Sequence, residues 1–218
     1  MPNDKDKRRS AVLDPIDRVT EVVFGVLMAL SFTGTLSVAM AGAEEVRTML
    51  FAALGCNIAW GLADAVMFLV GAQTEISRKV ALLRRLHAAR DAKLAHRLIA
   101  DELPERLVAG AGPDALEALR KRLIAMPIPN ARLSTDHYVG ALGVFILVVL
   151  ATFPVVVPFT FIPETMLALR VSNALALVTL FVGGLVLGRH ANGKPWHYGV
   201  SMAATGAVLV AAIVALGG

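Results

Sequence analysis

The chain has 218 residues, of which 56% are apolar, with a mean hydropathy of +0.67 and a formal net charge of +4. This composition is typical of a membrane protein and excludes most classes of soluble enzyme. A single cysteine, Cys56, excludes an intramolecular disulfide and cysteine-ligated zinc or iron–sulfur sites, and its apolar surroundings favour a packing role.

Five long apolar stretches fill most of the chain, at residues 19–41, 46–72, 138–162, 165–189 and 196–216. Each has roughly the 20 residues that a helix needs to cross a hydrocarbon core about 30 Å thick. Residues 73–137 are too charged for lipid and too long for a simple loop. The sequence therefore predicts an all-α polytopic membrane protein with five transmembrane helices and a helical insert, divided at 1–72, 73–137 and 138–218.

The distribution of basic residues predicts the orientation in the bilayer. With five spans, the N-terminal tail, the insert and the connection between the last two spans share one side, and they hold 19 of the 21 Lys and Arg residues. The positive-inside rule makes that side cytoplasmic, with the C-terminus outside. We expect a multi-pass protein of a bacterial inner membrane. The basic excess is then a topology signal rather than a nucleic-acid footprint, with attraction to anionic lipid as a second role.

The first stretch also resembles a signal peptide, because Ala39-Met40-Ala41 has the small residues of a cleavage site. Its apolar run is longer than that of a usual signal peptide, which favours an uncleaved first span. A short turn at 42–45 follows. Glu44 and Glu45 are placed favourably at the start of the second helix, where the helix dipole attracts negative charge.

The insert is predicted to be helical. Apolar residues recur at helical spacing over 74–99, with Thr74 as a possible N-cap. A short helix is expected at 103–109, a break at 110–112, and a further helix over 114–126 after Pro113, which suits a first-turn position.

Prolines and glycines mark special positions in the last three spans. Pro154 and Pro158 predict a kink in the third span that packs against protein, because lipid cannot satisfy the freed carbonyls. Gly184 and Gly188 in the fourth span and Gly206 in the fifth predict close helix contact.

Asp64 is the only acid well inside an apolar stretch, and it shares a helical stripe with Asn57, Gly61 and Met67. A carboxylate in hydrocarbon costs several kcal/mol unless it is paired, hydrated or protonated, which suits a group that exchanges a proton for a cation. The alternative is a structural role, in which Asp64 faces the headgroups or pairs with Arg18.

Three further residues could line a transport path. Met28 and Met67 are soft ligands for a transition metal, although methionines in membrane helices commonly serve packing. Glu21, near the cytoplasmic mouth of the first span, is either a first ligand for an incoming ion or a simple interfacial acid.

The insert contains a second group of candidate metal ligands. His87 and Asp91 are four residues apart and are expected to share a helical face, which suits a divalent metal. His96, Glu102 and Glu105 follow. Interleaved arginines make a solvated, salt-bridged helix an equal explanation. No catalytic set or phosphate loop is visible, so neither an enzyme nor a resident cofactor is expected.

The layout of two spans, a cytoplasmic insert and three spans resembles the vacuolar iron transporter family. The local matches are Val23-Phe24-Gly25-Val26-Leu27-Met28-Ala29 and Phe153-Pro154-Val155-Val156-Val157-Pro158-Phe159, which is similar to the family's proline pair. The resemblance implies a homodimer that exchanges Fe²⁺ or Mn²⁺ for protons, with an insert that binds metal through glutamates. Two features depart from the family: Met28 stands where it has an aspartate, and the insert is arginine-rich.

These observations predict a homodimeric transporter of a divalent transition metal, iron or manganese, that acts by proton-coupled export. Asp64 is the proton-coupled ligand, and Asn57, Met28, Met67 and Glu21 line the path. The alternative hypothesis is a membrane scaffold or regulatory protein that transports nothing and whose basic insert binds a partner or anionic lipid.

Overall fold

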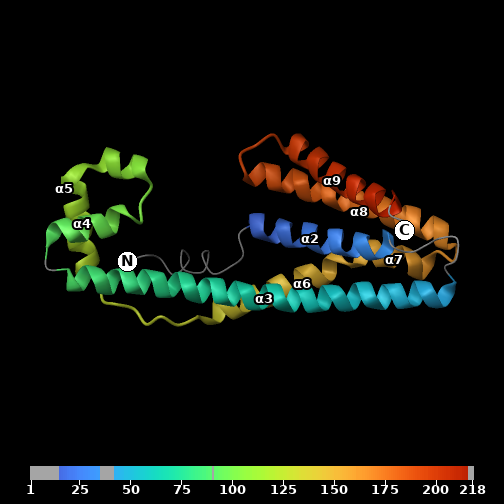
Figure 1. Ribbon diagram of the computed structural model, residues 1–218, viewed down its shortest axis with the longest axis horizontal. Coiled ribbons are helices and arrows are strands. Elements are labelled where there is room, and N and C mark those ends of the chain that lie inside the picture. The colour runs from blue at the N-terminus through green and yellow to red at the C-terminus, as the bar shows by residue number, and fades with distance from the viewer. Residues whose placement is uncertain (1–14, 35–41, 90, 216–218) are drawn as a thin grey trace. The chain divides into compact units, whose positions relative to one another are not determined.

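The computed structural model describes residues 15–34, 42–89 and 91–215. These residues form helices and connections with no strand, which confirms the predicted all-α class (Figure 1). The described helices are α2 (Pro15–Gly34), α3 (Ala43–Ala88), α4 (Ala92–Ala100), α5 (Glu105–Ile124), α6 (Thr135–Ala151), α7 (Phe153–Phe161), α8 (Thr165–His190) and α9 (Pro195–Ala215).

The chain forms two compact units. The first contains Met1–Phe68 and Thr135–Gly218, and the second contains Leu69–Ser134. Helix α3 contributes its first part to the first unit and its last part to the second.

Four helical segments among the described residues are long and apolar enough to cross a membrane: Glu44–Ala88, Thr135–Phe161, Thr165–His190 and Pro195–Ala215. Helix α2 is not among them, because its 20 residues include the charged Asp17, Arg18 and Glu21. The remainder of the predicted first span, with the cleavage-like Ala39-Met40-Ala41, lies outside the described residues.

The core of the first unit forms around α2. Val26, Ala29 and Leu30 are buried against Ala151 and Val155 of α6 and α7, and against two residues of α8. Figure 1 shows α2 between α8 and α9 on one side and α6 on the other, and α2 contacts all three. A 3.6-residue period explains why Val26, Ala29 and Leu30 share one face of α2. This helix is therefore at the centre of the bundle although charged residues occupy its first two turns.

The third predicted span is interrupted in its middle, as its prolines suggested. Helix α6 ends at Ala151 and α7 begins at Phe153, with Thr152 between them. Pro154 has no N–H to donate to the carbonyl four residues earlier, so regular helical bonding cannot continue through this point. Val155 and Pro158 are buried, and Ser172 of α8 donates a hydrogen bond of 2.7 Å to the Val155 carbonyl. The second half of this span, α7, is therefore packed against protein.

Helices α8 and α9 approach closely where their sequences contain glycine, which confirms that prediction. A methyl group added at Gly184 would lie 2.7 Å from the Gly199 Cα and even closer to the Tyr198 carbonyl oxygen. The rings of Phe181 and Trp196 pack edge to face, with centroids 5.2 Å apart. Backbone contact of this kind is the main way in which membrane helices gain packing energy.

The second unit differs from the predicted insert at its start. The expected helix over 74–99 is wrong, because α3 runs through Thr74 to Ala88 and a separate helix, α4, begins at Ala92. Thr74 is not a cap: its hydroxyl donates to the Val70 carbonyl within α3. Asp91 breaks the helix instead, because it takes an extended backbone and its carboxylate caps α4 by accepting from the Lys93 N–H at 3.1 Å.

A small hydrophobic core forms where α3 ends and α4 begins, on either side of the break at Asp91. Leu86 from the end of α3 is buried together with Ala95 and Ile99 of α4, and leucines of α5 pack against them. Helix α5 has its predicted interruption at Gly112, where φ is 71° and ψ is 171°. Glycine is therefore required at position 112, because it has no Cβ atom and adopts a positive φ without strain.

Candidate polar site in the helix bundle

Two carboxyl groups meet between α2 and α3. Asp64 of α3 and Asp17 of α2 lie near enough to Glu21 to interact with its carboxyl group, Asp64 more strongly than Asp17. Glu21 and Asp64 are half-buried. Sequence reasoning selected each of them separately, but their pairing depends on which faces of the two helices meet, and no local pattern reveals that.

Two neighbouring carboxyl groups can share a proton, because a protonated carboxyl donates a hydrogen bond and an ionised one accepts it. Two neighbouring ionised carboxylates would repel each other in a poorly hydrated bundle. Glu21 and Asp64 together therefore have the chemistry to share a proton or to bind a cation.

Asn57 is a second buried polar residue of α3, seven residues before Asp64. Its side chain is 0% exposed, and its Nδ2 donates to the Gly25 carbonyl at 3.0 Å and to the Thr152 hydroxyl. These bonds connect α3 to α2 and to the interruption between α6 and α7. Asn57 was predicted from its position on the Asp64 stripe, whereas Thr152 was not singled out. The signal that could have found Thr152 is its position two residues before Pro154.

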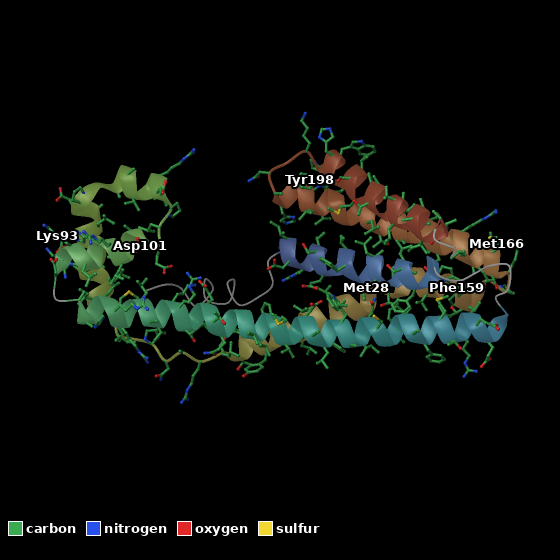
Figure 2. The ribbon with its side chains drawn as sticks, viewed as in Figure 1. Met28, Lys93, Asp101, Phe159, Met166 and Tyr198 are labelled. Atoms are coloured by element: carbon green, nitrogen blue, oxygen red, sulfur yellow. The ribbon has the colours of Figure 1, made fainter. Side chains whose placement is uncertain are left out.

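The two methionines of the predicted path are placed differently. Met28 is half-buried on α2 (Figure 2). Met67 of α3 is 65% exposed, although its spacing from Asp64 suggested a shared face. The described contacts therefore bring Glu21, Asp64 and Asn57 into the interior of the bundle and leave Met67 on its surface.

The predicted metal ligands of the insert do not gather into a site. His87 and Asp91 do not share a helical face, because α3 ends between them and Asp91 caps α4. His96 pairs with Glu117 at 2.8 Å, Glu102 lies 3.6 Å from Arg78, and Glu105 is in the first turn of α5. Among the described residues, no three His, Cys, Asp or Glu side chains come together as metal ligands.

Glu117 pairs with side chains of both α4 and α5, and the sequence did not predict these contacts. Its carboxylate accepts from Arg120 at 2.7 and 2.8 Å and pairs with His96 of α4. The hydrogen bonds from Arg120 and His96 lower the pKa of Glu117 to about 2. The spacing of Glu117 and Arg120 is a visible helical pair, but the contact with His96 depends on the fold. This cluster joins α4 to α5 (Figure 2 labels Lys93 and Asp101 at the two ends of α4).

Neither known protein-family models nor curated proteins match this sequence.

Proposed function

We propose that this protein is a membrane transporter that exchanges a divalent cation for protons. The observation that carries the proposal is the proximity of Glu21 and Asp64, two half-buried acids on two helices of an apolar bundle. Structural ion pairs normally combine opposite charges, so two acids in contact need a proton or a cation to balance them.

The exchange step balances without any further reactant. The pair with one shared proton has a net charge of −1. A divalent cation that binds between the two ionised carboxylates makes the site neutral, and the one shared proton is released. If that proton stayed, the site would have a net charge of +1. Neutrality favours release of the shared proton, because a net charge is costly inside the bundle.

The resemblance to the vacuolar iron transporter family supports Fe²⁺ or Mn²⁺ as the ion and a homodimer as the assembly. We propose five spans, with α2 as the first, and a topology that places the N-terminus and the second unit in the cytoplasm. Glu21 lies in the second turn of α2, so this orientation puts the acid pair near the cytoplasmic mouth, where the cation for export would bind.

The test is Mn²⁺ flux into proteoliposomes of the purified protein under a proton gradient. Glu21→Gln and Asp64→Asn should each reduce the flux at least about tenfold, because either change removes one ionisable ligand. Glu164→Gln is the matched control, since Glu164 is an exposed acid that precedes α8, and it should transport like the wild type. Full flux in both acid variants would remove the pair from the mechanism.

A second candidate function is a membrane scaffold that transports nothing. It is favoured by Met28, which stands at the position of the family's aspartate. A wild-type protein that moves no Fe²⁺ or Mn²⁺ under any proton gradient, but whose binding to anionic vesicles is abolished by salt, would support this alternative.

A further inference from the structure

A groove of about 370 Å³ lies on the first unit between α2, α6 and α8. Its walls are largely apolar and include Val19 and Val22 of α2, Leu147 of α6, and Val178 and Val182 of α8. Volumes of this order are typical of sites that bind small molecules. The segments of α6 and α8 that line the groove are long and apolar enough to cross a membrane, so its expected surroundings are lipid.

Gly183 forms part of the groove where α8 approaches α2. A methyl group at this position would lie 3.3 Å from the Val23 Cγ2 and 3.6 Å from the Val19 Cγ1. Thr179 also lines the groove, and its hydroxyl donates to the Leu175 carbonyl of its own helix at 2.8 Å. Its proton is therefore used within α8, and this part of the groove suits an alkyl chain rather than a polar ligand.

One end of the groove is positively charged. Arg18, the fourth residue of α2, is exposed and lines the groove together with the apolar residues. Figure 1 shows that α2 begins at the end of the bundle where α8 ends. Arg189, in the last turn of α8, follows Gly183 by six residues, or about 9 Å along the helix, and adds positive charge at that end. The groove therefore combines apolar walls with a basic end.

The acids of α2 face away from this groove. Asp17 and Glu21 interact with each other and are absent from the described lining. Each comes one residue before a lining residue, Arg18 or Val22, and is therefore turned about 100° around the helix from it. The negative charge of α2 is thus directed toward α3 and Asp64, and the positive charge of Arg18 toward the groove.

The occupant of such a groove is selected by its charge. Acyl chains alone give little selectivity, because the surrounding lipid is as apolar as the groove. Basic pockets between membrane helices bind anionic lipid headgroups. A second copy of the chain fits less well, because a twofold contact would set one concave surface against another and bring two Arg18 side chains together.

We propose that this groove binds one anionic phospholipid, with an acyl chain between α2, α6 and α8 and the phosphate at Arg18. A guanidinium group suits this role because it donates two parallel hydrogen bonds to a phosphate. The lipid site is separate from Glu21 and Asp64 and does not depend on the proposed transport.

The test is native mass spectrometry of the purified full-length protein in detergent with added dioleoyl phosphatidylglycerol. Dioleoyl phosphatidylcholine, which has the same chains and no net charge, is the reference lipid. The wild type should bind phosphatidylglycerol at least about fivefold more tightly, since one basic residue near a membrane surface contributes about that factor. Arg18→Gln should abolish this preference, and Arg18→Lys should retain most of it. Arg170→Gln is the matched control, because Arg170 is an exposed arginine near the opposite end of α8.

A second variant tests the apolar part of the groove while Arg18 is kept. Val178→Trp places a large side chain in the groove and should reduce phosphatidylglycerol binding at least about fivefold. Val208→Trp is its control, because Val208 is a similarly exposed valine of α9 outside the described lining.

Two results would overturn the lipid site: an unchanged headgroup preference in Arg18→Gln, or unchanged phosphatidylglycerol binding in Val178→Trp. Loss of a dimer in Val178→Trp with lipid binding intact would assign the groove to a second copy of the chain instead. Because binding is measured without Mn²⁺, failure of the proposed transport would leave these results unaffected.

Discussion

Asn57 of α3 donates a hydrogen bond to the hydroxyl of Thr152, a residue 95 positions later in the chain. Both side chains are buried, and the bond ties α3 to the point where α6 gives way to α7. Such polar contacts between membrane helices contribute modestly, because the separated helices also find partners.

A double-mutant cycle should detect this contact. Asn57→Ala and Thr152→Val should show a coupling energy of about 0.5–2 kcal/mol in SDS-induced unfolding. Thr179→Val provides the control, because the Thr179 hydroxyl donates to the Leu175 carbonyl of its own helix. Its coupling to Asn57→Ala should be near zero. Additive effects of Asn57→Ala and Thr152→Val would contradict the bond.

The contact between α8 and α9 should not tolerate a methyl group at Gly184. Gly184→Ala would push against the backbone of Tyr198 and Gly199, which cannot rotate away. We expect a loss of about 1–3 kcal/mol of stability, measured by unfolding in detergent. Gly55→Ala on α3, where no atom lies within 4 Å of the added group, should be neutral or slightly stabilising. Equal stability of the two variants would argue against the close approach.

The kink in α5 should depend on glycine. At Gly112 the backbone has φ 71° and ψ 171°, a combination that residues other than glycine rarely adopt. Gly112→Ala should cost about 1–3 kcal/mol. Gly110→Ala is the matched control, because Gly110 lies two residues away with helical backbone and open space around it. Thermal unfolding followed by circular dichroism would compare the two, and a Gly110 variant that is the less stable one would refute the prediction.

The second unit should lose stability in acid through Glu117. Hydrogen bonds from Arg120 and His96 lower the pKa of this group from 4.5 to about 2. A carboxylate with a lowered pKa in the folded state stabilises the fold above its unfolded pKa, and this contribution disappears as the pH falls through the folded pKa.

The measurement is the difference in unfolding temperature between the wild type and Glu117→Gln. That difference should be constant above pH about 5 and should shrink between pH about 4.5 and about 2. Subtracting the variant removes the contributions of the other acids. A difference that does not change over this range would mean that the cluster does not stabilise the fold through ionised Glu117.

Apolar length and proline positions predicted the last two helices well. The expected spans 165–189 and 196–216 correspond closely to Thr165–His190 and Pro195–Ala215, because each is a long apolar run and the second begins at a proline. The interruption near Pro154 was also predictable, since proline removes a helical hydrogen bond wherever it occurs.

Features that depend on long-range contact were not predictable in this way. The change in composition near Gln73 was read as a helix start, yet α3 continues through it, because a polar sequence can be as helical as an apolar one. The pairing of Glu21 with Asp64 depends on how two helices rotate against each other. The same holds for His96 and Glu117, which belong to different helices.

The central position of α2 also constrains how the protein is assembled. This helix is synthesised before all the other described ones, yet its buried residues Val26, Ala29 and Leu30 pack against Ala151, Val155 and Leu180, which are made more than a hundred residues later. Helices α8 and α9, in contrast, are joined by a short connection and pack against each other, so their hairpin can form locally. Helix α2 can therefore bury these residues only after α6, α7 and α8 have been synthesised.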